Sequence, residues 1–136
     1  MSGRSFKLEI VTPERVVLSH DVTSLVAPGS EGYLGILPDH APLMAELGLG
    51  EIKLVDTDGT ESHLATSGGF MQVQENSARI LADTAEHQEE IDITRAQEAV
   101  KRAEDRLRER MEGLDHARAE IALKRAVNRL RIARGG

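Results

Sequence analysis

The hydrophobic periodicity of this chain changes near residue 90, and that change constrains the fold more than any other feature of the sequence. Before it, apolar and polar residues alternate in short runs such as Phe6–Val11, which is the period of a half-buried β-strand. After it, apolar residues recur every three or four positions, as on one face of an α-helix. The sequence of 136 residues therefore predicts a β-rich domain, residues 1–87, and a helical domain, residues 88–136.

Strand signals recur through the first part of the chain at the spacing of about 8–12 residues that is typical of all-β folds. We expect strands at residues 6–11, 15–18, 22–27, 51–55, 61–65, 68–73 and 78–82. The Asp58-Gly59 pair is a strong hairpin signal, because glycine adopts a positive φ without strain. The pattern predicts an antiparallel β-sandwich or flattened barrel, and an aromatic content of only 2% predicts an aliphatic core.

The second part predicts two antiparallel helices. Asp92 can accept a hydrogen bond from a free backbone N–H and so cap the first helix, and Gly113 suits a left-handed helix end. The second helix is expected to start near Asp115. The apolar stripes are Ala96, Val100, Ala103, Leu107 and Met111 on the first helix, and Ala119, Ala122, Leu123, Ala126, Leu130 and Ala133 on the second. Stripes rich in alanine let two backbones approach closely, and a pair that buries so little can move.

Charge divides at the same place as periodicity. Residues 1–90 carry 5 basic and 15 acidic side chains, whereas residues 91–136 carry 12 and 8, within a net charge of -6. The division indicates two surfaces that meet different partners. A solvated helical pair that simply carries many arginines is the alternative. Nucleic acid is a weak explanation, because the basic part has no aromatic residue to stack on bases.

Several kinds of active site are disfavoured. The chain has no cysteine, which excludes disulfides, thiolate metal sites and cysteine nucleophiles. Gly29–Gly35 lacks the Lys and Ser/Thr that follow the last glycine of a phosphate loop, so we interpret it as a structural turn. The five histidines share no metal-ligand spacing. No signal peptide or membrane-spanning run is evident, so we expect a soluble cytoplasmic protein. Because none of these site patterns is present, we also expect no catalytic residue and no metal.

Four arginines of the helical part can meet. Arg95 and Arg102 are seven residues apart on the first helix, and Arg125 and Arg129 are four apart on the second. Folding the hairpin at Gly113 places Arg102 level with Arg125, and Arg95 nearly level with Arg129. Guanidinium groups gathered in this way repel one another unless an anion lies among them, and a polyphosphate suits them because each guanidinium can fork to phosphate oxygens. Ordinary exposed arginines are the alternative.

Four stretches resemble one known family, the epsilon subunit of F-type ATP synthases (delta in mitochondria). They are Gly32–Pro42 (GYLGILPDHAP), Ser67–Phe70 (SGGF), Ala82–Glu86 (ADTAE) and Ile91–Ala96 (IDITRA). The last resembles the I/L-D-x-x-R-A motif of members that bind ATP. The resemblance covers essentially the whole chain and implies a sandwich of about ten strands followed by a helical hairpin.

The resemblance also implies an ATP site. Its residues would be Glu86, Ile91, Asp92, Arg95, Ala96, Arg102, Arg125 and Arg129. Residues 91–96 would hold adenine and ribose, with Glu86 near the sugar and the arginines on the phosphates. ATP would be a regulatory ligand bound without Mg²⁺, no cofactor would be required, and no hydrolysis is expected, because nothing here activates a water.

The role implied by the resemblance is that of a non-catalytic rotor subunit on the cytoplasmic side of the cell membrane. The sandwich would bind the gamma shaft and the c-ring, with the turn at residues 28–31 as our choice for the c-ring contact, and would couple proton-driven rotation to catalysis by the alpha and beta subunits. Folded on the sandwich, the hairpin would permit ATP hydrolysis; extended along gamma, it would reach acidic beta-subunit loops and block rotation. The basic residues for that contact are Arg118, Lys124, Arg125, Arg129, Arg131 and Arg134. Two alternatives are a purely structural coupling subunit that neither binds ATP nor inhibits, and an unrelated nucleic-acid adaptor.

Overall fold

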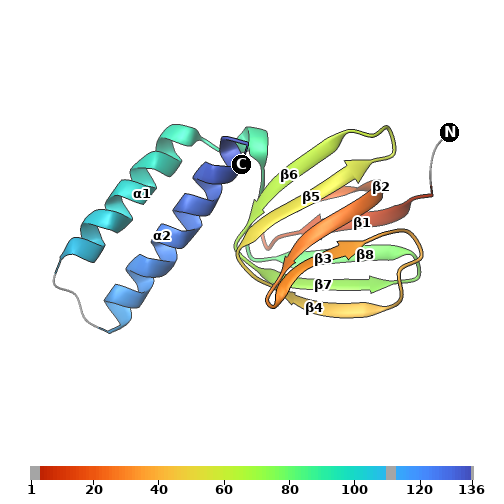
Figure 1. Ribbon diagram of the computed structural model, residues 1–136, viewed down its shortest axis with the longest axis horizontal. Helices are drawn as coiled ribbons and strands as arrows, with labels where there is room; N and C mark the ends of the chain where they lie inside the picture. The colour runs from red at the N-terminus through yellow and green to blue at the C-terminus, as the bar shows by residue number, and fades with distance from the viewer. Residues whose placement is uncertain (1–3, 110–112, 136) are drawn as a thin grey trace. The chain divides into compact units, whose positions relative to one another are not determined.

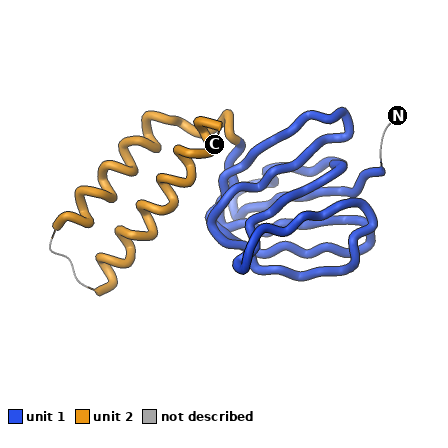
Figure 2. The backbone as a smooth tube through the Cα atoms, in the orientation of Figure 1, with its two compact units in different colours: residues 1–87 blue, residues 88–136 orange. Residues whose placement is uncertain are grey.

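The computed structural model describes residues 4–109 and 113–135, and the chain divides into two compact units, residues 1–87 and 88–136 (Figures 1 and 2). The first unit contains β1 (Phe6–Val11), β2 (Val16–Gly29), β3 (Gly32–Ile36), β4 (Leu43–Leu47), β5 (Gly50–Asp56), β6 (Glu61–Thr66), β7 (Gly69–Gln74), β8 (Ser77–Ala82) and β9 (Ala85–His87). The second contains the 3-10 turn η1 (Gln88–Glu90), α1 (Ile93–Arg108) and α2 (Leu114–Ala133). The expected fold class, a sandwich followed by a helical hairpin, is confirmed, with nine strands in the described residues.

The strands run in the order β1-β8-β7-β4-β2-β5-β6-β9, and β1 also pairs with β2, so the sheet closes on itself. Strand alternation directs one set of side chains inward, and the inner set is almost entirely aliphatic, with Phe6 as the aromatic residue of the described core cluster. Leu8, Ile10, Ile52 and Ile80 have no exposed surface. The expectation of an aliphatic core is confirmed for the residues that the structure describes.

Several local expectations for the sheet were wrong. The runs at 15–18 and 22–27 form one strand, β2, because the exposed residues between them still pair with β1 (Glu9 with Ser19, Lys7 with Asp21). The pairing of β1 with β8 is parallel, although an antiparallel sheet was expected. Strands β3, β4 and β9 were not expected as separate strands. Gly29–Gly35 belongs to the hairpin between β2 and β3, which agrees with the structural turn expected there.

The turn between β5 and β6 forms where the Asp58-Gly59 pair predicts it. Gly59 has a φ of 88°, and the backbone N–H of Thr60 donates to Asp58 Oδ1 at 2.9 Å. Hydrogen bonds from the backbone N–H and then from the hydroxyl of Thr60 hold the pKa of Asp58 below its usual value, because both stabilise the carboxylate.

The hairpin buries Ala96, Ala103, Ala119 and Ala126 of its predicted stripes, but Ala122 of the predicted stripe is exposed, and the helices end differently from the prediction. In the described residues α1 stops at Arg108 with Glu109 as its C-cap, and Met111, expected on its stripe, lies outside the described residues. Gly113 has the expected positive φ, 61°, but it precedes α2 and does not terminate α1. Neither described helix is both long and apolar enough to span a bilayer.

Candidate functional site

The first turn of α1 is built around Asp92. Its side chain accepts a hydrogen bond from the backbone N–H of Arg95 at 3.1 Å, which satisfies one of the four N–H groups that a helix start leaves without a partner. Ile91 before it is 6% exposed and Ala96 is fully buried, while Asp92 and Arg95 are exposed. The segment IDITRA therefore has a structural role as well as the proposed binding role: it caps the helix and supplies a packing residue.

The packing seam of the hairpin is made of alanines. Ala96 and Ala103 are buried on α1, and Ala119 and Ala126 are buried on α2. The two positions are seven residues apart on each helix, and the helices run antiparallel (Figure 1). The simplest register therefore aligns Ala96 with Ala126 and Ala103 with Ala119.

This register sets the heights of the four arginines. At 1.5 Å of rise per residue, Arg125 and Arg129 each lie within about 3 Å, along the helix axis, of the level of Arg95. Arg102 lies on the same helix as Arg95, about 10 Å nearer the turn. Arg95, Arg102 and Arg125 are exposed and Arg129 is half-buried. The alanine register thus places Arg95 near the level of both arginines of α2. It places Arg102 nearer the turn than Arg125, whereas folding at Gly113 predicted that these two would be level.

Helical periodicity also places the four side chains on one side of the hairpin. Successive residues are about 100° apart around a helix. Arg95 and Arg102 lie about 100° from the alanine seam on α1; Arg125 lies about 100° and Arg129 about 60° from it on α2, in the same rotational sense. Because the helices run in opposite directions, rotation in the same sense brings both pairs to one side, which we call the arginine side.

Glu86 differs from the other residues of the implied ATP site, because it belongs to the first unit. It lies in β9, opposite Ala65 of β6, and is half-buried. The remaining seven residues belong to the second unit, between Ile91 and Arg129.

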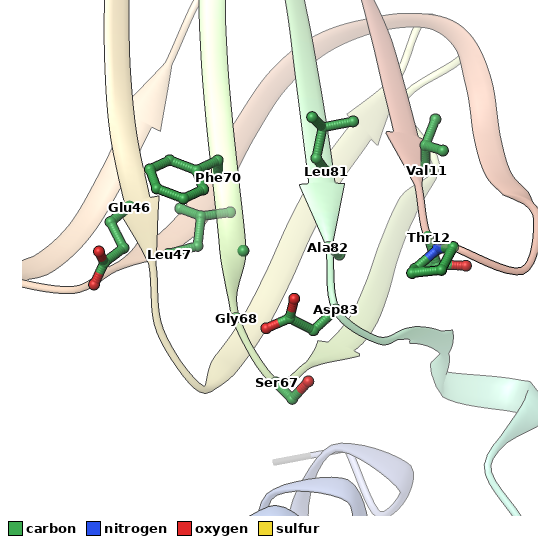
Figure 3. Close-up of a pocket in the computed structure, with 12 residues that line it drawn as sticks. Val11, Thr12, Glu46, Leu47, Ser67, Gly68, Phe70, Leu81, Ala82 and Asp83 are labelled. Carbon is green, nitrogen blue, oxygen red and sulfur yellow. The ribbon is translucent and has the colours of Figure 1, made fainter.

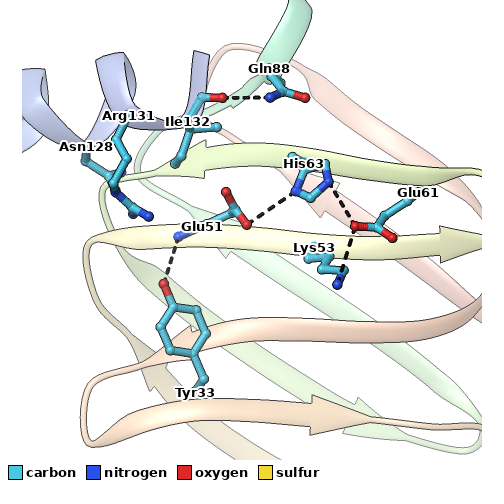
Figure 4. A network of polar contacts seen from close by, with 9 residues as sticks. All are labelled: Tyr33, Glu51, Lys53, Glu61, His63, Gln88, Asn128, Arg131 and Ile132. Carbon is cyan, nitrogen blue, oxygen red and sulfur yellow. Dashed lines mark hydrogen bonds and ion pairs between the residues drawn. The ribbon is translucent and has the colours of Figure 1, made fainter. Parts of the chain in front are cut away.

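The open end of the hairpin is held by contacts that sequence reasoning missed. Gln88 Nε2 donates to the carbonyl oxygen of Ile132 at 2.7 Å, so a side chain of η1 satisfies a carbonyl in the last turn of α2 (Figure 4). Ile132 is fully buried, and Asn128, 7% exposed, accepts a hydrogen bond from Arg131 Nη2 at 3.0 Å. Helical periodicity could have indicated these contacts, because Asn128 and Ile132 lie on the face of α2 opposite the alanine seam. The helix α2 therefore has two buried faces.

His20, His63 and His116 lie beside carboxylates, whereas His40 and His87 contact backbone carbonyl oxygens. His63 lies between Glu51 and Glu61, with its ring nitrogens 3.3 Å and 3.1 Å from their oxygens, and Lys53 Nζ lies 3.4 Å from Glu61 (Figure 4). The backbone N–H of Glu51 donates to Tyr33 Oη at 3.3 Å. Within the described ranges, no group of His, Asp and Glu is arranged to hold a metal ion.

A second candidate surface lies on the outer face of the sheet. The register places four outward residues in one row across β4, β7, β8 and β1: Glu46 opposite Phe70, Phe70 opposite Leu81, and Leu81 opposite Val11. Phe70 is 54% exposed and Leu81 is 53% exposed. We call Glu46, Phe70, Leu81 and Val11 the outer row. Adjacent large apolar side chains left open to water are typical of a surface that another protein covers.

The outer row borders a groove of about 630 Å³ at the end of the sheet (Figure 3). The lining residues include Thr12, Pro13, Ser67, Gly68 and Asp83 beside members of the outer row. The loop is held by its own hydrogen bonds: Gly68 N–H donates to Thr66 Oγ1 at 3.2 Å, and the Thr84 hydroxyl donates to Ser67 Oγ at 2.7 Å. A loop fixed in this way gives the groove a defined rim.

Gly69 explains the Ser-Gly-Gly-Phe motif beside this groove. Its φ is 144°, and a Cβ on it would lie 2.1 Å from the carbonyl oxygen of Leu81. Only glycine therefore lets β7 begin so close to β8. With Met71 and Val73 directed into the core, strand alternation directs Phe70 outward. Sequence reasoning missed this exposed phenylalanine, although the alternation of Phe70, Gln72 and Gln74 with Met71 and Val73 was the signal for it.

Both parts of the chain match models of the same family. Residues 5–88 match the beta-sandwich domain of the ATP synthase delta/epsilon chain, and residues 89–134 match its long alpha-helix domain. An ATP synthase epsilon chain of Syntrophomonas wolfei is 49% identical over 107 residues, covering 79% of this chain and 78% of the relative. Another, of Moorella thermoacetica, is 54% identical over 106 residues, covering 78% and 79%.

Solved structures are similar to this chain in fold. A chain in the mitochondrial ATP synthase of Euglena gracilis, solved with OSCP, F1 and the c-ring, aligns with a TM-score of 0.79 at 23% identity, covering 91% of this chain and 78% of that chain. A chain in the central stalk and c-ring of the Tetrahymena thermophila enzyme aligns with a TM-score of 0.61 at 18% identity, covering 98% and 97%. With both of its parts matched by the family models and with bacterial epsilon chains about half identical to it, this chain belongs to the ATP synthase delta/epsilon family, as a subunit that is not itself catalytic.

Proposed function

We propose that this chain is a rotor subunit of an F-type ATP synthase whose sandwich binds the gamma shaft and the c-ring and whose hairpin regulates ATP hydrolysis by binding ATP. The regulatory part rests on one observation: the arginine side of the hairpin gathers Arg95, Arg102, Arg125 and Arg129 on the two described helices. Such a surface favours an anion with several negative charges. In the proposed role the chain works at the cytoplasmic face of the cell membrane.

The arginines and the first turn of α1 divide the recognition of ATP between them. Arg95, Arg125 and Arg129 stand at one level, where each can fork to phosphate oxygens. Ile91 and Ala96 offer apolar surface to the adenine ring, and Glu86 is proposed to contact the sugar. Because arginines neutralise the phosphate charge, the proposed site requires no Mg²⁺.

Regulation follows from competition for the same arginines. Arg125 and Arg129 hold phosphate in the compact state of the hairpin, and in an extended state they face acidic loops of the beta subunits. ATP favours the compact state by as much as its affinity for that state exceeds its affinity for the other. The compact state permits hydrolysis, and the extended state blocks rotation against the alpha and beta subunits.

Calorimetric titration of the purified chain with ATP tests the site. Arg95→Ala and Arg125→Ala each remove a charged hydrogen-bond donor, so ATP affinity should fall by about ten- to a hundredfold. Lys101→Ala, on α1 but away from the arginine side, is the matched control and should leave the affinity unchanged. Unchanged ATP affinity in both arginine variants would refute the proposed ATP site.

The sandwich contact with gamma is proposed at the outer row. Phe70 and Leu81 would lie against an apolar strip of the shaft, and Glu46 beside them would pair with a basic side chain. Phe70→Ser should weaken capture of purified gamma, whereas Gln72→Ser, on the same face of the same strand, should not. Equal capture by both variants would place the gamma contact elsewhere. The β2–β3 hairpin, with Ser30 and Glu31 exposed at its tip, remains our proposal for the c-ring contact.

A purely structural coupling subunit is the second candidate. It is favoured by the hydrogen bond from Gln88 to Ile132, which ties the start of the second unit to the end of α2. In that case ATP would change neither helical content nor compactness of the purified chain. Circular dichroism and small-angle scattering with and without ATP separate the two candidates.

A further inference from the structure

The strand β3 has one paired side and one free side. Within residues 4–109 and 113–135 it pairs with β2 and with no other strand. Gly32 and Gly35 are exposed, and because glycine has no side chain, the exposed surface is that of the main chain itself. The free side of β3 is therefore open to water.

The register shows which backbone groups lie on this free side. Pro28 of β2 is opposite Tyr33, and Val26 is opposite Gly35. Pro28 has no N–H, and its carbonyl oxygen accepts from the N–H of Gly48, next to β5, at 2.8 Å. Pro28 and Tyr33 are therefore not hydrogen-bonded to each other, and by the alternation of antiparallel pairs the same holds for Val26 and Gly35. The N–H and C=O groups of Tyr33 and Gly35 thus point toward the free side, as two donors and two acceptors.

The side chains of β3 leave the free edge clear. Tyr33 Oη accepts a hydrogen bond from the backbone N–H of Glu51 at 3.3 Å, so the ring reaches across β2 toward β5 (Figure 4). Gly35 contributes no side chain, and a Cβ built on it would meet nothing within 4 Å. A neighbouring strand could therefore reach the backbone of β3 without displacing a side chain.

This edge lacks the usual protection against pairing. Native proteins keep edge strands short, place charges or proline in them, or bend them with a bulge. The strand β9, at the end of the strand order, has three residues and carries Glu86. By contrast, β3 has five residues, GYLGI, with no charge and no proline, in continuous register with β2. An open and uncharged edge of this kind is a template on which another chain can add a strand.

The charge around β3 indicates what kind of chain fits. Residues 16–52 contain five Asp and Glu and no Lys or Arg. Glu31 is exposed at the tip of the β2–β3 hairpin, and within the described residues it takes part in no ion pair. A basic segment is attracted to this region, whereas a second copy of the same strand brings the same negative charge and is repelled.

We propose that the free edge of β3 binds an extended basic segment of a partner protein, which adds a strand to the sheet. The main chain of the segment pairs with the N–H and C=O groups of Tyr33 and Gly35, and a Lys or Arg side chain lies near Glu31. Main-chain hydrogen bonds supply the affinity in this mode of recognition, and the alternate side chains supply the specificity. The edge adjoins the hairpin tip proposed for the c-ring contact, but the inference does not rest on that contact, on the gamma contact or on ATP binding.

NMR titration of the isotope-labelled full chain tests the inference. The probe is a capped basic peptide of about six residues, the length of an average strand, in which lysine alternates with valine. The amide signals of Tyr33 and Gly35 should shift, and both amides should exchange more slowly with solvent, because the added strand covers them. The same peptide with glutamate in place of lysine is the charge control and should bind several-fold more weakly.

Gly35→Pro removes one of the outward donors while keeping the bonds to β2, because proline is tolerated where the N–H of an edge strand faces solvent. Peptide affinity should fall about tenfold, since one hydrogen bond is lost and the ring stands in its place. Gly35→Ala, which keeps the N–H, is the matched control and should bind as the unchanged chain does. Glu31→Lys leaves the backbone unaltered and should weaken binding of the basic peptide about two- to threefold. Circular dichroism establishes that each variant is folded.

Three outcomes would overturn the inference. One is no binding of the basic peptide, or signal shifts that lie away from β3. Another is equal affinity in Gly35→Pro and Gly35→Ala, or equal affinity for the acidic and the basic peptide. The third is a concentration-dependent dimer in analytical ultracentrifugation that Gly35→Pro dissociates and that excludes the peptide, which would make a second copy of this chain the occupant of the edge.

Discussion

Gly69 is the position where the packing of the sheet depends most on the absence of a side chain, and Gly69→Ala tests that directly. A Cβ there would lie 2.1 Å from the Leu81 carbonyl oxygen and 2.8 Å from Ala82 Cα, both in the backbone of β8. The φ of 144° adds a conformation that alanine avoids, at about 1–3 kcal/mol. Separating two paired strands adds an overpacking cost of about 1–3 kcal/mol. We expect a total loss of about 2–6 kcal/mol in the free energy of unfolding of the first unit.

Alanine substitutions at two other glycines separate the cost of the backbone conformation from the cost of overpacking. Gly59→Ala, at a φ of 88° with nothing within 4 Å, should cost only the backbone conformation, about 1–2 kcal/mol. Gly35→Ala, in β3 with nothing within 4 Å and no positive φ, should be neutral or stabilise by about 0.5–1 kcal/mol. Urea unfolding followed by Tyr33 fluorescence reports on the first unit alone, because the chain has one tyrosine and no tryptophan. A Gly69→Ala protein within about 1 kcal/mol of Gly35→Ala would refute the reasoning.

Three further predictions follow from the local contacts. Asp92→Ala should destabilise the hairpin by about 1 kcal/mol through loss of its cap, seen as a lower melting temperature of the helical circular dichroism signal. Gln88→Ala removes the donor to the Ile132 carbonyl and should cost about 1 kcal/mol; faster amide exchange confined to the last turn of α2 would be its signature. An NMR titration of Asp58 should give a midpoint below 3.8, because Thr60 donates to its carboxylate. Since its folded-state pKa is depressed, its small contribution to stability is present above the unfolded pKa and is lost as pH falls through the folded value; a midpoint at or above 3.8 would contradict this.

The outer row and the arginine side divide the proposed function between the two units. The outer row is a largely apolar surface on a sheet whose inner side chains are buried, which suits the proposed contact with a partner. The hairpin packs through alanines and presents cations, so under the proposed function a bound anion would stabilise it. A stable shaft contact and a ligand-sensitive hairpin are therefore consistent with the amino acids that each unit uses.

Local signals in the sequence were sufficient for the fold class and for the start of each helix. Strand alternation, the Asp58-Gly59 turn and the Asp92 cap involve residues within a few positions of one another, and their hydrogen bonds form within one turn. The alanine stripes predicted the hairpin seam for the same reason. The arginine side also follows from helical periodicity, once the antiparallel register is known.

Tertiary structure decided what depends on partners far apart in the chain. The strand β9 has three residues and exists because β6 offers it a free edge, and β2 continues through exposed Ser19–Asp21 because β1 pairs with it there. The parallel pairing of β1 with β8 joins segments about seventy residues apart, which no local pattern encodes. The requirement for Gly69 likewise depends on β8 lying alongside β7. The sequence by itself determined the two-part fold class, the Asp58-Gly59 turn and the cap of the first helix, because those preferences are local; only the closed sheet determined which strands are neighbours and where β2, β3, β4 and β9 form.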